Sequence, residues 1–186
     1  MKKPELLAPA GDLEKLKIAF IYGADAVFIG GKMFSLRARA SNFDIPQIKE
    51  ACDFAHSLGK KVYVTTNILP HNDNIEGLTE YLQDLESVGV DAIICASPVI
   101  IETAKKDTNL EVHISTQLSS TNYHSVNFWK EEGITRVVMA RELNKHELKE
   151  LRDNTDADIE VFIHGGMCVS YSGRCTLSNN MTDRDA

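Results

Sequence analysis

The sequence predicts an α/β protein built as a (β/α)8 TIM-like barrel, and three observations support this fold class. Short β-branched strands alternate with amphipathic helical stretches along the whole chain. The strands are almost wholly apolar, as in a parallel sheet covered on both faces. Three joints also repeat one pattern, in which a glycine ends a helix and one apolar and one short polar residue precede a strand: 22–27, 88–93 and 132–137. A doubly wound dinucleotide-binding sheet fits less well, because residues 8–12 lack a G-x-G-x-x-G loop.

Strands and helices are expected in strict alternation. The strands are expected at 4–10, 25–31, 60–67, 91–97, 110–117, 134–141 and 159–166. The helices between them are expected at 13–22, 46–58, 76–88, 98–107, 122–132 and 143–153. Apolar residues recur with helical spacing on one face of the first and third helices: Leu13, Leu16 and Phe20, then Leu78, Leu82 and Leu85. Asp12 is a suitable N-cap for the first helix, Pro98 starts the fourth, and glycines end helices at 23, 59, 89 and 133.

The length of the chain bears on how complete this barrel is. A (β/α)8 barrel usually takes about 250 residues, whereas this chain has 186 and seven expected strands. We therefore expect a single domain, residues 1–186, that is the N-terminal part of a longer protein and lacks the eighth strand. Open edges beside the first and seventh strands could then pair with another copy, giving a homo-oligomer.

Charge and aromatic content give a mixed indication about nucleic acid. The net charge of −7 argues against a protein held to nucleic acid by bulk charge alone. Arginines could still form a local positive rim: Arg37, Arg39, Arg141, Arg174 and Arg184. Two of these lie in a long loop, residues 32–43, which could bind an anion or a nucleic-acid backbone. Phe34 and Phe43 of this loop could stack on bases, or could be tucked into a solvated connector.

Composition also limits the compartment of the protein. No apolar run approaches the ~20 residues of a membrane span, and the first residues lack the apolar core of a secretory signal. We therefore expect a cytoplasmic protein without a membrane segment. Four cysteines do not make a disulfide scaffold in a chain of this size. Cys52, within a helix, and Cys95, within an apolar strand, are expected to be small core residues.

Polar residues gather where the apolar strands end. In a barrel the active site lies at the carboxyl ends of the strands, where the βα loops meet. Asn67, Gln117, Arg141 and His164 all stand at such ends and are expected to point into the mouth of the barrel. Gln117, Arg141 and His164 are therefore our candidate catalytic residues.

The densest candidate site comes after the seventh strand. Cys168 and Cys175 are separated by six residues, among glycines at 165, 166 and 173 that allow tight turns. A reducing cytosol disfavours a disulfide between them. Two thiolates are too few for a closed zinc or iron–sulfur centre, which usually needs four protein ligands. Cys168 as a nucleophile with His164 as its base, or two idle cysteines, are further alternatives that spacing alone leaves open.

This segment also resembles a known family. E-x-F-x-x-G-G-M-C at residues 160–168 and S-G-R-C-x-L-S at 172–178 are similar to the signature of the collagenase-like peptidases, family U32, whose catalytic type is unassigned. Four further segments match the family in order, so the resemblance covers nearly the whole chain: 5–11, 23–27, 115–117 and 140–142. The family name implies proteolysis of collagen-like protein substrates. Its better-understood members imply prephenate-dependent hydroxylation of tRNA wobble uridine or of ribosomal RNA, or oxygen-independent hydroxylation of ubiquinone precursors.

The resemblance also implies a cofactor. The quinone hydroxylases carry a [4Fe-4S] cluster on four cysteines, and Cys168 and Cys175 match the first two of these. In the full-length protein they would therefore be cluster ligands, and the other two would come later in the chain. Arg141, Gln117 or His164 would hold an anionic cosubstrate such as prephenate, which is a hypothesis from their places at the strand ends.

Two activities compete as interpretations of this sequence. A Ser/His/Asp triad order, a G-x-S-x-G elbow and an H-E-x-x-H motif are all absent from the sequence, which counts against hydrolysis. The sequence therefore favours a tRNA hydroxylase over a peptidase for the full-length protein, and predicts little or no activity for these 186 residues alone.

Overall fold

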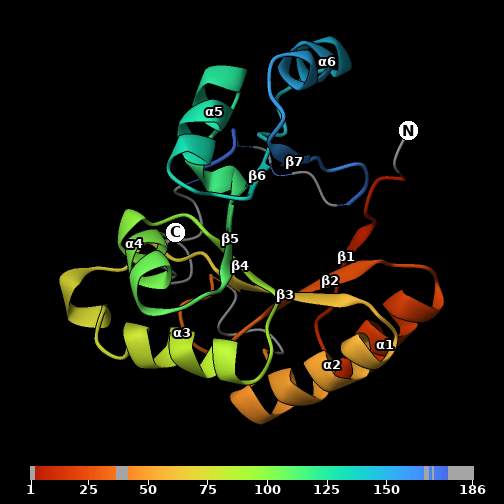
Figure 1. The fold of residues 1–186 in the computed structure, drawn as a ribbon, viewed down its shortest axis with the longest axis vertical. Coiled ribbons are helices and arrows are strands. Elements are labelled where there is room, and N and C mark those ends of the chain that lie inside the picture. The colour runs from red at the N-terminus through yellow and green to blue at the C-terminus, as the bar shows by residue number, and fades with distance from the viewer. Residues whose placement is uncertain (1–2, 37–41, 166–167, 169, 176–186) are drawn as a thin grey trace. The chain divides into compact units, whose positions relative to one another are not determined.

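The computed structural model describes residues 3–36, 42–165, 168 and 170–175, and the chain forms two compact units, residues 1–110 and 111–186 (Figure 1). Among the described residues, no helix is both long enough and apolar enough to cross a membrane. Three arginines of the expected positive rim lie outside the described residues: Arg37, Arg39 and Arg184.

The first unit alternates four parallel strands with four helices. In chain order these are β1 (Leu7–Pro9), α1 (Leu13–Ile21), β2 (Ala26–Gly30), α2 (Ile45–Ser57), β3 (Lys61–Thr66), the short 3-10 helix η1 (Asn72–Asn74), α3 (Leu78–Ser87), β4 (Ala92–Cys95) and α4 (Pro98–Asp107). Strands β1 to β4 pair in the order of the sequence, and each of these pairings is parallel. Helices α1, α2 and α3 lie side by side along one face of this sheet (Figure 1).

The core of the first unit consists of the apolar strand residues and the leucine faces of the helices. Its fully buried members include Leu16, Val27, Ile48, Val62, Val64, Leu82, Leu85 and Ile93. Cys52 on α2 and Cys95 on β4 are also fully buried and free, as expected. Burial raises the pKa of each thiol to about 12, so both stay protonated and unreactive at neutral pH.

The repeated joints have a physical function that the sequence pattern alone does not state. At Asp25 the carboxylate accepts a hydrogen bond from the Leu6 backbone N–H (3.1 Å), and at Asp91 it accepts one from the Val62 N–H (2.8 Å). Each aspartate precedes a strand and so fastens the beginning of the strand beside it. Thr135, at the third joint, donates instead to the Val112 carbonyl (3.4 Å). The joint glycines adopt positive φ angles of 101°, 90° and 82°, which explains why glycine ends these helices.

The second unit repeats the same alternation. It contains β5 (Glu111–Ile114), the 3-10 helix η2 (Thr116–Leu118), α5 (Tyr123–Glu131), β6 (Arg136–Val138), α6 (Lys145–Asp153) and β7 (Asp158–Glu160). The strands pair in parallel, β5 with β6 and β6 with β7. Asn122 caps α5 through the Ser125 N–H, and Asn144 caps α6 through a reciprocal capping box with Glu147.

Every helix and strand expected from the sequence is present, but all seven strands are shorter than predicted, most of all β6 and β7. The strand predicted at 159–166 ends at Glu160, whose carbonyl accepts from the Met139 N–H just beyond β6 (2.9 Å); the next two amides, of Ala140 and Arg141, donate instead to the Ser120 carbonyl and the Ser172 hydroxyl. Val161, Phe162 and Ile163 are apolar yet 39%, 55% and 81% exposed. His164 consequently lies in a bend beyond the strand, not at its end.

The hydrogen bond and ion pairs of the Asp25 carboxylate predict that the stability of the fold depends on pH. The Leu6 N–H, Lys60 and Lys3 hold the pKa of Asp25 at about 2, below its usual value of 3.8. Since folding lowers this pKa, the ionised carboxylate stabilises the fold fully above pH 3.8, and the contribution is lost as the pH falls towards 2. Asp25→Asn keeps an oxygen for the Leu6 N–H but removes the charge. We expect the wild type to exceed Asp25→Asn in unfolding temperature at pH 5, with the difference vanishing near pH 2.

Asp73→Asn is the matched control for this experiment, because Asp73 is exposed and has no ion pair within the described part of the chain. Thermal unfolding monitored by circular dichroism between pH 2 and 6 measures all three proteins. A difference between wild type and Asp25→Asn that stays constant over this pH range would contradict the account.

Candidate functional site

At the carboxyl ends of the strands of the second unit, one short segment is fastened to two of them. The segment is residues 170–175, and it contains the S-G-R-C sequence that begins at Ser172. Its attachments lie in the turn after β6, at Arg141 and Glu142, and in the residues after β5, at Gln117 and Ser119. We call residues 170–175 the cysteine segment, because it ends in Cys175.

Ser172 makes most of the attachments. It is only 2% exposed, and its backbone and side chain both form hydrogen bonds. Its N–H donates to the Glu142 carboxylate, and its carbonyl accepts from the Ser119 hydroxyl at 2.5 Å. Its hydroxyl oxygen accepts from the backbone N–H of Arg141 (3.3 Å) and from Nε of the same residue (3.4 Å). Arg141 also donates through Nη2 to the Ser170 carbonyl at 3.5 Å.

Gly173 allows the backbone of the segment to lie directly against the residues after β5. The turn is closed by a hydrogen bond from the Arg174 N–H to the Tyr171 carbonyl (3.1 Å), and Gly173 within it has a φ of +70°. A Cβ atom at this position would stand 2.0 Å from the Gln117 carbonyl oxygen, far inside van der Waals contact. Glycine is therefore required here for both its conformation and its size.

Glu142 keeps its charge at this site. Partial burial raises the pKa of its carboxyl, but the hydrogen bonds from the backbone N–H groups of Ser172 and of Glu142 itself, with the neighbouring Arg141, outweigh that effect. The net result is a lowered pKa, so the group is a carboxylate at neutral pH and accepts the Ser172 N–H in its stronger, charge-assisted form.

The structure brings together some of the predicted site residues. Arg141 and Gln117 both contact the cysteine segment, and Gln117 is held on η2, where its Oε1 accepts from the Ser115 hydroxyl at 3.2 Å. Cys175 ends the segment and is half-buried, whereas Cys168 is exposed. Neither cysteine is in a disulfide. His164 is exposed and, within the described residues, shares no hydrogen bond with Cys168, so their catalytic pairing stays a prediction.

A metal centre would need further ligands. No group of three or more histidine, cysteine, aspartate or glutamate side chains suited to hold a metal ion occurs in the described part of the chain. Of the four cysteines, Cys168 and Cys175 are the two that are not buried.

The first unit uses its strand-end polar residues to hold a loop. Asn67 accepts the Leu36 N–H through Oδ1 (3.3 Å), and the hydroxyls of Ser35 and Thr65 lie 3.1 Å apart. Phe34 and Phe43 are 7% and 3% exposed, so they pack into the unit and are not available to stack on bases. That corrects one of the two alternatives for the loop at 32–43.

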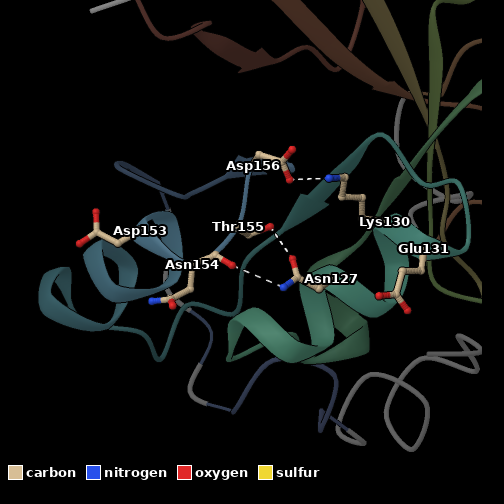
Figure 2. Close-up of a pocket in the computed structure, with 7 residues that line it drawn as sticks. All are labelled: Asn127, Lys130, Glu131, Asp153, Asn154, Thr155 and Asp156. Atoms are coloured by element: carbon tan, nitrogen blue, oxygen red, sulfur yellow. Dashed lines mark hydrogen bonds and ion pairs between the residues drawn. The ribbon is translucent and has the colours of Figure 1, made fainter.

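One hollow in the second unit lies away from the cysteine segment. It measures about 570 Å³ and is lined by Asn127, Lys130, Glu131 and residues 153–156, at the carboxyl ends of α5 and α6 (Figure 2). Its side chains are largely paired with one another. Asn127 accepts from the Thr155 hydroxyl (2.7 Å) and donates to the Asn154 carbonyl (3.4 Å), and Lys130 pairs with Asp156. This end of the unit is where the strands begin, so the hollow is not the strand-end site.

The fold and the site indicate the class of protein: an α/β protein of the parallel barrel kind, with a cysteine-bearing segment held at the carboxyl ends of its strands. The family model described as Peptidase family U32 matches residues 11–186, and the chain belongs to that family. A solved structure of a U32 peptidase superimposes with a TM-score of 0.69 at 14% identity, covering 87% of this chain and 70% of that one. This likeness confirms the predicted barrel-like fold class.

Several relatives of the chain are named for RNA hydroxylation, while one at 38% identity, from Methanocaldococcus jannaschii, is named an uncharacterized protease. The chain is 58% identical over 186 residues to tRNA hydroxylation protein P1 of Bacillus subtilis, covering 100% of this chain and 44% of that protein. It is 41% identical over 187 residues to tRNA hydroxylation protein P of Escherichia coli, covering 100% and 41%. It is also 41% identical over 182 residues to the Escherichia coli 23S rRNA 5-hydroxycytidine synthase, covering 98% and 27%. The chain thus spans less than half the length of these relatives.

The close approach at Gly173 predicts a large effect of one added methyl group. Gly173→Ala should force the turn away from the Gln117 carbonyl and break the hydrogen bonds of Ser172 with it. We expect trypsin to cleave after Arg174, which is exposed, at least about tenfold faster in this variant, because local opening is the step that proteolysis requires.

Gly165→Ala is the matched control. Gly165 also has a positive φ, of +137°, but nothing lies within 4 Å of a Cβ placed there. It therefore adds backbone strain without the collision. Cleavage after Arg174 at equal rates in both variants would show that the contact with Gln117 does not hold the turn.

Proposed function

We propose that the full-length protein is an RNA hydroxylase and that its substrate is tRNA, hydroxylated at the wobble uridine. The observation that carries this proposal is the 58% identity, over the whole of this chain, to a protein named for tRNA hydroxylation. Relatives at 41% identity named for tRNA and for 23S rRNA hydroxylation support the same reaction class. Proteolysis is suggested by the family name, and no feature of the described residues favours it. Since tRNA is the substrate, we place the protein in the cytoplasm.

The cysteine segment supports a cofactor of the iron–sulfur type. We infer that Cys168 and Cys175 provide two of the four thiolates of a [4Fe-4S] cluster. Both are free, and neither is sealed in the core as Cys52 and Cys95 are, so both can reach an inorganic cluster. The remaining ligands would come from outside the described residues. When bound, such a cluster would supply electron transfer at the site.

The strand ends beside the segment suit an anionic cosubstrate. Arg141 uses Nε and one N–H of Nη2 to hold the segment, and its other guanidinium N–H groups have no partner among the described residues. Arginine presents such donors in a fork that matches a carboxylate. Prephenate, with two carboxylates, would be held here by Arg141, with the Gln117 amide beside it and exposed His164 as a further donor. These roles are proposals.

RNA can approach this end of the second unit despite the net charge of −7. Tyr171 is 73% exposed on the cysteine segment, and Arg174 is exposed three residues later. An exposed aromatic ring beside a cation suits an unpaired base and its phosphate.

The cysteine assignment predicts a specific pattern of loss. In a strain that lacks the gene, the full-length protein carrying Cys168→Ala or Cys175→Ala should leave the hydroxylated uridine of tRNA at the level of the empty strain. Cys52→Ala and Cys95→Ala are the matched controls, and they should restore the modification because both residues only fill the core. Mass spectrometry of nucleosides from total tRNA measures the result.

Two further outcomes decide against the proposal. Unchanged tRNA in the deletion strain, together with lost cleavage of gelatin, would favour the peptidase. An anaerobically reconstituted full-length protein without an iron–sulfur signal in its EPR and electronic spectra, with both cysteine variants active, would remove the cluster.

A further inference from the structure

We propose that Ser172 is a positioning residue that holds Cys175 at the carboxyl ends of β5 and β6, with Arg141 and Glu142 as the groups that act on it. The inference rests on the proposed function only for the role it gives Cys175. The placement itself rests on hydrogen bonds and on the burial of Ser172.

Every polar group of Ser172 forms a hydrogen bond. Its N–H, its carbonyl and its hydroxyl each have a protein partner, and those partners come from two different strand ends. A serine whose only purpose was to make a turn would bond to its own segment and face solvent. Ser172 is instead 2% exposed and bonds to residues 30, 31 and 53 positions away.

Arg141 and Glu142 bind Ser172 from two sides. These two consecutive residues follow β6. One accepts a hydrogen bond from Ser172, and the other donates hydrogen bonds to it. Glu142 takes the backbone N–H as a carboxylate, and Arg141 gives two N–H groups to the hydroxyl oxygen. Hydrogen bonds with a charged partner are the stronger kind, so the pair fixes both the position and the orientation of the residue.

Only two residues, Gly173 and Arg174, separate Ser172 from Cys175. Gly173, pressed against the Gln117 carbonyl, and Arg174, bonded back to Tyr171, leave this turn with little freedom. Cys175 comes directly after it and is half-buried, whereas Cys168, which precedes the segment, is exposed. The hydrogen bonds of Ser172 therefore restrict the position of the Cys175 thiol more than that of the Cys168 thiol.

Ser120 provides a matched comparison in the same part of the chain. It is a serine that is 1% exposed, but its hydroxyl has no hydrogen-bond partner in the described part of the chain. Ser120→Ala and Ser172→Ala each remove one buried hydroxyl, and only the second removes hydrogen bonds.

The test is the rate at which each thiol of the intact protein reacts with iodoacetamide, after treatment with a chelator, read residue by residue by mass spectrometry. In Ser172→Ala we expect Cys175 to react about tenfold faster, as the loss of two hydrogen bonds predicts. Cys168, already exposed, should change by less than about twofold, and Ser120→Ala should leave both thiols within about twofold of the wild type. Cys52 and Cys95, which are buried, should stay unlabelled in every variant; a variant in which they are labelled has unfolded globally, and the Glu142 variants then decide.

Glu142 supplies a second pair of variants if Ser172→Ala does not fold. Glu142→Gln keeps an oxygen that can accept the Ser172 N–H, and Glu142→Ala does not. We expect Cys175 to react faster in Glu142→Ala and to return most of the way to the wild-type rate in Glu142→Gln. Equal rates for Cys175 in the wild type, Ser172→Ala and Glu142→Ala would overturn the proposal. Because the reaction needs neither a cluster nor RNA, its outcome is separate from that of the proposed function.

Discussion

The hydrogen bonds that join Ser172 to the residues after β6 hold the cysteine segment at the carboxyl ends of the strands of the second unit. β6 has only three residues, Arg136–Val138, and β7 has three more. Strands this short offer few backbone groups for pairing, so side chains just beyond them must hold the neighbouring loops. Arg141 and Glu142 do this for the cysteine segment, and the thiol of Cys175 is thereby kept near the strand ends.

Fastening by side chains also explains the beginnings of the strands. Asp25 and Asp91 stand at the joints before β2 and β4, and each carboxylate accepts a backbone N–H from the neighbouring strand. The joints therefore set the register where each strand begins, while Arg141 and Glu142 fix the cysteine segment where β6 ends. In both places a carboxylate accepts a hydrogen bond from a backbone N–H. Such a charge-assisted hydrogen bond is stronger than one between neutral groups.

The elements of this fold could be predicted because their signals are local. Apolar periodicity, helix-ending glycines and capping residues all act over a few positions, and every expected helix and strand is present. The lengths of the strands could not be predicted in the same way. Val161, Phe162 and Ile163 continue the apolar pattern of β7, yet pairing stops at Glu160 because the Ala140 and Arg141 amides beyond β6 donate to Ser120 and Ser172 instead. Pairing depends on a neighbour that the local sequence does not contain.

The residues of the site also fall into those that the local sequence predicts and those that depend on distant neighbours. Arg141 and Gln117 could be selected from their places at strand ends, and Cys175 from its spacing with Cys168 and from the family resemblance. Ser172, Ser119 and Glu142 could not, because a serine or glutamate in a loop is ordinary until its partners are known. The glycine of the S-G-R-C motif was the available signal, and its meaning, a backbone pressed against the Gln117 carbonyl, emerges only in three dimensions.

Hydrogen exchange of the Ser172 backbone amide in the unaltered protein tests the central claim most directly. This N–H donates to Glu142 in a residue that is 2% exposed, so we expect it to exchange as slowly as the Met139 amide, which pairs with the Glu160 carbonyl. Exchange of the Ser172 amide at the rate of an unstructured peptide, with the Met139 amide protected, would contradict the account.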